Sequence, residues 1–253
     1  MACMNLYRAM FRRKSVRRYH MHPLSTKVLT ELNDYASGLE PLFEDITVKF
    51  TFAKHGEVRN LLPVRAPHYV LISSEKKDNY LYNVGFMGQQ IDLFLSANGL
   101  GSCWMGAAKP RPGQIVKQPG NLDFVIMLGF GKPAEPLHRT DVSQFRRKPM
   151  SQISSVKDGE RLLEPVRLAP SAVNRQPWCF YGTTSEVHIG RTKLNPLTST
   201  LYDRLNQIDT GIALCHLVLS AQHMGRPVCF RFAGPRETEP PKGYQYVITA
   251  NIT

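Results

Sequence analysis

The chain has 253 residues, of which 42% are hydrophobic and 21% charged, as is ordinary for a soluble globular protein with one large domain or two small ones. The formal net charge of +12 fits either a nucleic-acid-binding surface or a binding site for phosphorylated small molecules. We favour the second interpretation, because no zinc finger or aromatic RNA-binding pattern accompanies the scattered basic residues. The five cysteines are widely spaced and include no Cys-x-x-Cys pair, which argues against a disulfide framework and a bound metal. The sequence has no apolar run of roughly 18 residues and no secretory signal, which argues against a membrane span and secretion. We therefore expect a cytoplasmic protein that binds neither nucleic acid nor membrane.

The first half of the chain alternates between helical and strand-like patterns. Apolar side chains recur at threes and fours in residues 24–37, which Pro23 opens and Gly38 follows. Apolar and polar residues alternate in residues 46–53, as in a half-buried strand. The predicted elements of this half are helices at residues 4–13, 24–37 and 79–98, and strands at residues 46–53, 68–73 and 123–128.

The second half repeats this order. Its predicted elements are a helix at residues 157–168, a loop at 169–177, strands at 178–181 and 186–189, a helix at 204–224 and a strand at 244–249. The two long helices, compared at an offset of 124 residues, share five identities in the nine positions that begin at Leu93 and Leu217. We interpret residues 1–150 and 151–253 as two similar α+β halves, related by an internal duplication.

Arg13, Ser15 and Arg17 alternate along a short basic segment. In extended backbone such alternate side chains point to one side, so two guanidinium groups and a hydroxyl would converge there. This set of donors suits a phosphate dianion, which accepts charge-assisted hydrogen bonds. A solvated basic run is the alternative interpretation of the segment taken alone.

Residues 170–178 read Pro-Ser-Ala-Val-Asn-Arg-Gln-Pro-Trp. The two prolines restrict this loop, which lowers the entropy cost of presenting its polar groups. Asn174 and Gln176 each offer a donor and an acceptor, as does the edge of a planar heterocycle with alternating carbonyl and N–H groups. The alternative interpretation is an N-capped turn that leads into a core tryptophan.

Together these segments resemble the nitroreductase family of FMN-dependent oxidoreductases, and most of all the subgroup in which two nitroreductase-like halves are fused in one polypeptide. The resemblance rests on four motifs: Arg-x-Ser-x-Arg, Pro-Ser-x-x-Asn-x-Gln-Pro, Gly-Leu-Gly followed by Trp, and Gly-x-Pro-Ala-Glu before a basic segment. The matching residues are Arg13, Ser15, Arg17, Pro170, Ser171, Asn174, Gln176, Pro177, Gly99, Leu100, Gly101, Trp104, Gly131, Pro133, Ala134, Glu135, Arg146, Arg147 and Pro149.

The resemblance implies an α+β nitroreductase-like fold in which two halves mimic the family homodimer. It also implies that FMN is bound, with the phosphate held by the first motif and by a late basic residue. The implied cofactor-binding residues are Arg13, Ser15, Arg17, Gly99, Gly101, Arg147, Pro170, Ser171, Ala172, Asn174 and Gln176.

The chain departs from the family pattern because each half carries only one of the two main motifs. The first half lacks the Asn-x-Gln-Pro loop, and the second half lacks the Arg-x-Ser-x-Arg motif. The resemblance therefore implies one composite flavin site per chain, so that a monomer suffices for cofactor binding.

The implied activity is ping-pong transfer of a hydride from NADH or NADPH to flavin N5 and then to a small-molecule acceptor such as a nitroaromatic or a quinone. The flavin would carry the chemistry, without a catalytic side chain or a metal. The alternatives are a flavin carrier or sensor without robust turnover and a basic nucleic-acid-binding module. Cys103 is a candidate redox residue, although a small buried residue at a helix end is the favoured interpretation.

Overall fold

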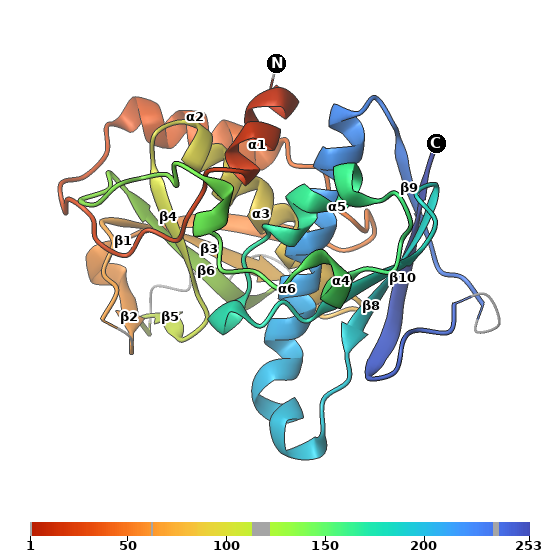
Figure 1. Ribbon diagram of the computed structural model, residues 1–253. Helices are drawn as coiled ribbons and strands as arrows, with labels where there is room; N and C mark the ends of the chain where they lie inside the picture. The colour runs from red at the N-terminus through yellow and green to blue at the C-terminus, as the bar shows by residue number, and fades with distance from the viewer. Residues whose placement is uncertain (1, 62, 113–121, 235–237) are drawn as a thin grey trace. The chain divides into compact units, whose positions relative to one another are not determined.

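The computed structural model describes residues 2–61, 63–112, 122–234 and 238–253 (Figure 1). The chain forms two compact units. Unit 1 comprises Met1–Phe11 and Ser143–Thr253, and unit 2 comprises Arg12–Val142. The sequence-based division into residues 1–150 and 151–253 did not anticipate that the first helix joins the C-terminal unit.

Unit 2 is built on a four-stranded antiparallel sheet with the order β1-β3-β6-β4. A small two-stranded sheet, β2-β5, accompanies it. The elements of unit 2 are α2 (Thr26–Ser37), β1 (Val48–Lys54), the 3-10 helix η1 (His55–Glu57), β2 (Val58–Asn60), β3 (His68–Ser74), α3 (Tyr80–Ala97), β4 (Gly101–Met105), β5 (Ala108–Pro110) and β6 (Asp123–Gly131).

The central strands of this sheet are buried on both faces, which explains their nearly continuous apolar sequence. Val70 packs with Leu32 and Ile91, which come from the helices α2 and α3. The next residue, Leu71, faces the opposite side and packs in a cluster with Val16 of the N-terminal segment. The segment that carries Arg13, Ser15 and Arg17 is therefore held by the core of unit 2.

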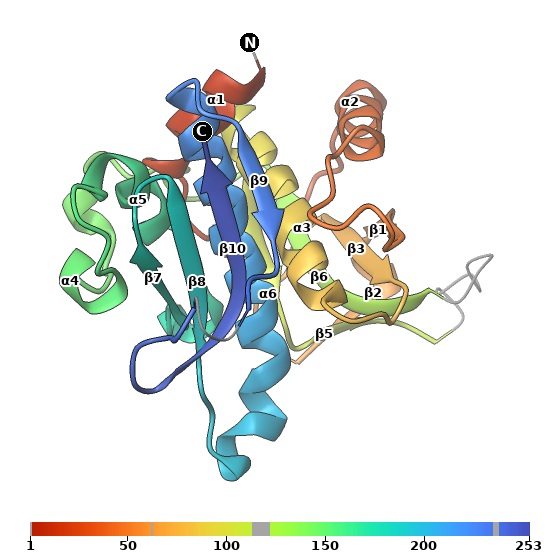
Figure 2. The same cartoon turned by 90° about the vertical axis from the view of Figure 1, so that its right-hand side faces the viewer.

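Unit 1 contains a second four-stranded antiparallel sheet, with the order β7-β8-β10-β9 and with α6 packed along it (Figure 2). Helix α1 packs against α6, where the rings of Tyr7 and His223 stack with centroids 3.7 Å apart. The elements of unit 1 are α1 (Ala2–Met10), α4 (Met150–Ile153), α5 (Glu160–Arg167), η3 (Ala172–Asn174), β7 (Trp178–Gly182), β8 (Glu186–Thr192), α6 (Pro196–His223), β9 (Val228–Arg231) and β10 (Tyr244–Ile252). The 3-10 helix η2 (Val142–Gln144) spans the change from unit 2 to unit 1.

The two sheets have the same topology. In each sheet the first strand along the chain pairs with the second, the second with the fourth, and the fourth with the third. In each unit the long helix, α3 or α6, lies in sequence between the second and the third strand of that sheet. The structure thus confirms a mixed α/β fold, and most predicted helices and strands are present. The helix predicted at residues 4–13 ends at Met10, however, so that Arg13 lies beyond it.

No helix in the described part of the chain is both long and apolar enough to cross a membrane. The same part of the chain contains no group of three or more His, Cys, Asp or Glu side chains that could hold a metal ion.

Candidate functional site

The Arg13–Arg17 segment is extended and is fixed to two neighbouring parts of unit 2. Ser15 forms a parallel β-bridge with Ser102 of β4, and the Val16 N–H donates to the Ser102 carbonyl at 2.9 Å. Arg13 forms an antiparallel bridge with His138. Ser15 is half-buried and Arg17 is exposed, whereas Val16 between them is fully buried. The segment therefore presents Ser15 and Arg17 while Val16 anchors it.

Gly101 allows this anchoring. A Cβ atom at Gly101 would lie 2.7 Å from Cγ1 of Val16, closer than real side-chain contacts allow. The absence of a side chain thus lets the segment lie against β4. Gly101 contributes to the candidate site by packing, which is a role that its position in a motif does not reveal.

Arg13 is buried and paired within unit 2. Its Nε lies 3.0 Å from Oδ2 of Asp92 on α3, and both side chains are at most 2% exposed. The Nε–H makes no hydrogen bond, so this contact is an ion pair without a well-directed hydrogen bond. Asp92 also accepts hydrogen bonds from Ser102 Oγ at 2.5 Å and from Gln89 Nε2 at 3.1 Å. Arg13 Nη2 in turn donates to Ser15 Oγ at 3.3 Å.

Arg139 joins this basic group, although no pattern in the sequence singles it out. Its main-chain N–H donates to the Arg12 carbonyl at 2.8 Å, and its Nη1 donates to the Arg13 carbonyl. Burial, together with the positive charges of Arg13 and Arg17, lowers the pKa of Arg139 to about 10. Neighbouring like charges of this kind create a positive potential that favours a bound anion.

Cys103 lies beside this group and is buried. Burial raises the pKa of its thiol, which keeps it in the less reactive protonated form. This environment suits a packed core residue.

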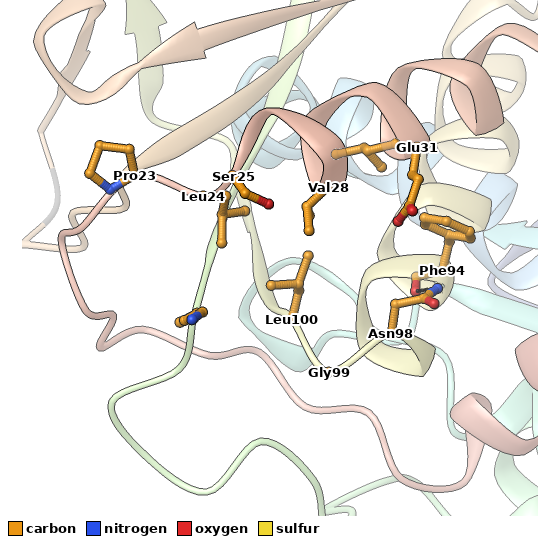
Figure 3. A pocket seen from close by; sticks show the side chains of 11 residues that line it. Pro23, Leu24, Ser25, Val28, Glu31, Phe94, Asn98, Gly99 and Leu100 are labelled. Carbon is orange, nitrogen blue, oxygen red and sulfur yellow. Dashed lines mark hydrogen bonds between the residues drawn. The ribbon is translucent and has the colours of Figure 1, made fainter.

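Gly99 lies at a separate pocket of about 370 Å³ within unit 2 (Figure 3). Val28 of α2 and Leu100 point toward each other across this pocket. Neither Arg13, Ser15 nor Arg17 lines it. Gly99 has a positive φ of 78°, which ends α3 in a conformation that glycine adopts readily.

In unit 1, the loop between α5 and β7 has an unusual backbone. Val173, Asn174 and Gln176 all have positive φ values, of 44°, 57° and 49°. Such a conformation is rare for residues other than glycine and is especially unfavourable for a β-branched residue. Val173 is nevertheless 77% exposed, so burial of its side chain does not compensate.

The amide side chains of this loop are engaged with residues 146–148. Arg147 Nη1 donates to Asn174 Oδ1 at 2.6 Å, and Asn174 Nδ2 donates to the Arg146 carbonyl at 2.6 Å. The Lys148 N–H donates to Gln176 Oε1 at 2.7 Å, and Gln176 is only 2% exposed. These contacts lock the second half of the loop. They leave Asn174 exposed and Gln176 inaccessible from outside.

The first half of the loop is held from α6. The Ala172 N–H donates to both carboxyl oxygens of Asp209, at 3.1 and 3.0 Å. Asp209 is 4% exposed, and burial raises the pKa of its carboxyl group to about 8, against the lowering effects of the Ala172 N–H and of Arg175. Pro170 is buried, and Ser171 is half-buried with its Oγ accepting from the Gln176 N–H at 2.9 Å.

The main-chain N–H groups of residues 171–176 differ in whether they have a hydrogen-bond partner. The N–H groups of Ala172, Asn174, Arg175 and Gln176 are all bonded within unit 1. Those of Ser171 and Val173 make no hydrogen bond to any residue that the structure describes. The tip of the loop therefore exposes Val173, and two main-chain donors at this tip have no partner among the described residues.

The predicted site residues thus fall into two groups. Arg13, Ser15, Arg17, Gly99 and Gly101 belong to unit 2. Arg147, Pro170, Ser171, Ala172, Asn174 and Gln176 belong to unit 1. Sequence reasoning missed Asp92, Arg139 and Asp209, which no local motif marks.

A protein-family model described as "Putative TM nitroreductase" matches residues 5–221. The chain belongs to this family. Its membership supports an oxidoreductase activity. Among curated proteins, no relative was found.

The fold is shared with a solved nitroreductase structure over nearly the whole chain. A "putative nitroreductase" from Thermotoga maritima is 25% identical, with a TM-score of 0.67, and the match covers 98% of this chain and 93% of that one. An FMN-dependent nitroreductase from Clostridium difficile R20291 is 17% identical, with a TM-score of 0.44 over 55% of this chain and 93% of that chain. A nitroreductase family protein from Clostridium novyi NT is 18% identical, with a TM-score of 0.42 over 51% and 86%.

Proposed function

We propose that the protein is an FMN-dependent NAD(P)H oxidoreductase of the fused, two-half nitroreductase type. The observation that carries this proposal is the division of the two family motifs between the two units of one chain, each within a sheet of the same topology. One flavin would be bound per chain, and a small-molecule electron acceptor would be the second substrate.

Unit 2 fits the phosphate end of FMN. Ser15 and Arg17 lie on the accessible part of the extended segment, and Arg139 adds a cation whose lowered pKa reflects its burial and the like charges around it. A phosphate dianion would relieve this repulsion and accept charge-assisted hydrogen bonds. Arg13, which is buried and paired with Asp92, would act mainly by fixing Ser15 and the shape of the segment.

Unit 1 fits a planar, electron-accepting ligand. The strained loop presents the N–H groups of Ser171 and Val173, and donors fixed in this way stabilise negative charge that develops on a bound ring. Arg147 donates a hydrogen bond to Asn174 and so shapes the loop. Burial and the positive charge of Arg175 lower the pKa of Lys148. Asn174 keeps one donor hydrogen and one lone pair for a ligand, while Gln176 supports the loop from below.

Bound FMN would supply the redox chemistry, accepting a hydride from NADH or NADPH and passing it to a nitroaromatic, quinone or similar acceptor in a ping-pong cycle. The residues of this chain would bind and orient the flavin and the two substrates. We assign no acid–base side chain to the reaction. We further propose a cytoplasmic location, in keeping with five widely spaced cysteines that include no Cys-x-x-Cys pair.

The test is an absorbance spectrum of the purified protein after incubation with FMN and removal of the free cofactor. We expect a flavin spectrum that bleaches when NADPH or NADH is added without oxygen and returns when a quinone is added. A protein that stays colourless contradicts the proposal. A flavin-loaded protein that neither nucleotide reduces supports the alternative of a flavin carrier.

The phosphate assignment is tested by comparing Arg17→Ala with Arg18→Ala. Both changes remove one exposed positive charge from the same segment, but Arg18 pairs with Glu135 at 3.3 Å and is the matched control. Loss of a charge-assisted contact should raise the FMN dissociation constant of Arg17→Ala by about tenfold or more, while that of Arg18→Ala changes little. Equal effects of the two changes would mean that only net charge matters.

A further inference from the structure

Asn206 of α6 is an unusual buried residue. Its side chain is 0% exposed, and neither Oδ1 nor Nδ2 forms a hydrogen bond within the described parts of the chain. Buried amides are nearly always hydrogen-bonded, because an unpaired donor or acceptor loses its contacts with water and gains nothing. A residue that keeps both a donor and an acceptor unpaired in a core needs an explanation.

The neighbours of Asn206 on α6 place it under the strained loop. Tyr202, Asn206 and Asp209 are spaced i, i+4 and i+7, so they share one face of the helix. Both flanking residues contact the loop: the guanidinium carbon of Arg175 lies 4.2 Å from the centre of the Tyr202 ring, and Asp209 accepts the Ala172 N–H. Asn206 therefore lies on the face of α6 that supports residues 172–175, between two points of contact.

The loop itself does not use this amide. Its own amide side chains, Asn174 and Gln176, bond to residues 146–148 and to the loop backbone. The main-chain carbonyl of Asn206 accepts from Thr210 Oγ1 at 2.8 Å, whereas neither polar atom of its side chain has a partner among the described residues. The unused donor and acceptor are thus confined to the side-chain amide.

We infer that Asn206 is a ligand-binding residue whose amide is reserved for the polar edge of the flavin that the loop receives. A primary amide pairs its donor and acceptor with a ring edge that alternates N–H and carbonyl groups, as the flavin pyrimidine ring does. This inference rests on the proposed function. Asn206 lies on α6, outside every family motif of the sequence. It would make a contact with the ring edge that the loop amides are not free to make alone.

The inference makes an unusual prediction for the protein without its ligand. Asn206→Leu replaces the unpaired amide by an apolar group of similar size, which should leave the apo protein as stable as before or more stable. The same change should raise the FMN dissociation constant by on the order of tenfold or more, because the ring edge then lacks its partner. A residue with a purely structural role would not combine these two effects.

Asn83 of α3 offers a matched control. It is also an asparagine at 0% exposure in a long helix, but its amide is fully engaged. Its Oδ1 accepts from the N–H groups of Leu42 and Phe43 at 2.7 and 3.2 Å, and its Nδ2 donates to the carbonyls of Phe43 and Ile46 at 3.2 and 3.3 Å. Asn83→Leu should therefore lower the thermal stability of the apo protein clearly, in contrast to Asn206→Leu.

The experiment measures thermal unfolding of the apo proteins and FMN titration by quenching of flavin fluorescence, for the wild type and both variants. Retained or increased stability of Asn206→Leu together with weakened FMN binding supports the inference. A loss of stability like that of Asn83→Leu overturns it, and so does unchanged FMN affinity. Failure of the wild type to bind FMN would overturn the proposed function and this inference with it, whereas normal binding by both wild type and Asn206→Leu would overturn the inference alone.

Discussion

At the scale of single residues, two buried carboxylates show how this protein accommodates charge. Asp92 in unit 2 has the guanidinium of Arg13 at 3.0 Å and accepts two further side-chain hydrogen bonds. Asp209 in unit 1 accepts a main-chain N–H, with Arg175 as a more distant positive charge. A buried carboxylate with fewer charged partners is easier to protonate. Burial accordingly raises the pKa of Asp209 to about 8.

The raised pKa of Asp209 predicts how stability depends on pH. Its folded-state pKa of about 8 lies above the ordinary value of 3.8, so between about pH 4 and pH 8 the native state binds more protons than the unfolded state and loses stability as the pH rises. The variant Asp209→Asn keeps a side-chain acceptor for the Ala172 N–H, but its amide does not titrate. The melting temperature of Asp209→Asn should therefore exceed that of the wild type by a margin that grows from pH 5 to pH 8 and then levels off.

The matched control is Asp203→Asn, which removes the same charge from a half-exposed position on the same helix, where Asp203 pairs with Arg191. Thermal unfolding of the apo proteins at several pH values is the measurement. A margin between Asp209→Asn and the wild type that stays constant across this range would show that Asp209 does not titrate as its burial requires.

At the scale of elements, most helices and strands could be predicted because their apolar patterns are long. The helix predicted at residues 79–98 is α3 (Tyr80–Ala97), and the strand predicted at 68–73 is β3 (His68–Ser74). The sequence did not reveal β4 (Gly101–Met105), because its glycine reads as the end of a helix, or β9 (Val228–Arg231), which is only four residues long. Short strands depend on their partners in the sheet more than on their own sequence.

The residues of the candidate site could be predicted only where they lie together in a short motif of the sequence. Ser15 and Arg17 lie in a motif of five residues and could be selected from the sequence. Arg139 and Asp209 could not, because their significance comes from residues that lie far away along the chain, namely Arg13 and Ala172. The pairing of Arg13 with Asp92 and of Asn174 with Arg147 is likewise a tertiary contact that alternation and spacing cannot show.

The conformation of the loop between α5 and β7 gives a prediction for an element. Val173 has a φ of 44° and a ψ of 27°, where a β-branched side chain is strained, and its side chain is 77% exposed. Asparagine tolerates this region better, so Val173→Asn should raise the free energy of unfolding of the apo protein by about 1 kcal/mol. Val173→Ala, which stays strained, is the control and should gain less. Urea denaturation measures the difference, and equal midpoints for the two variants would show that the loop does not store strain at this residue.

At the scale of the whole molecule, the two sheets share one topology. Both sheets join their first, second, fourth and third strands in that order, and both insert a long helix between the second and the third. We propose that the halves arose by internal duplication and that each has lost the motif that the other keeps. On this proposal a single flavin would need one phosphate motif and one loop, and the chain contains one of each.

This view predicts the result of mixing two variants that each bind FMN weakly. Arg17→Ala impairs the phosphate motif in unit 2, and a deletion of the exposed tip residue Val173 impairs the loop in unit 1. If the flavin site were shared between two chains, unfolding and refolding the variants together would regenerate one intact site per mixed pair, and FMN binding would partly return. If one chain supplies both motifs, every chain in the mixture carries a defect, and FMN binding stays as low as in the separate variants.

We expect the mixture to bind FMN no better than the separate variants. We also expect the wild type to bind about one FMN per chain at every protein concentration, measured by native mass spectrometry. Recovered FMN binding in the mixture would show that the site forms between two chains, so that a single chain does not bind FMN by itself.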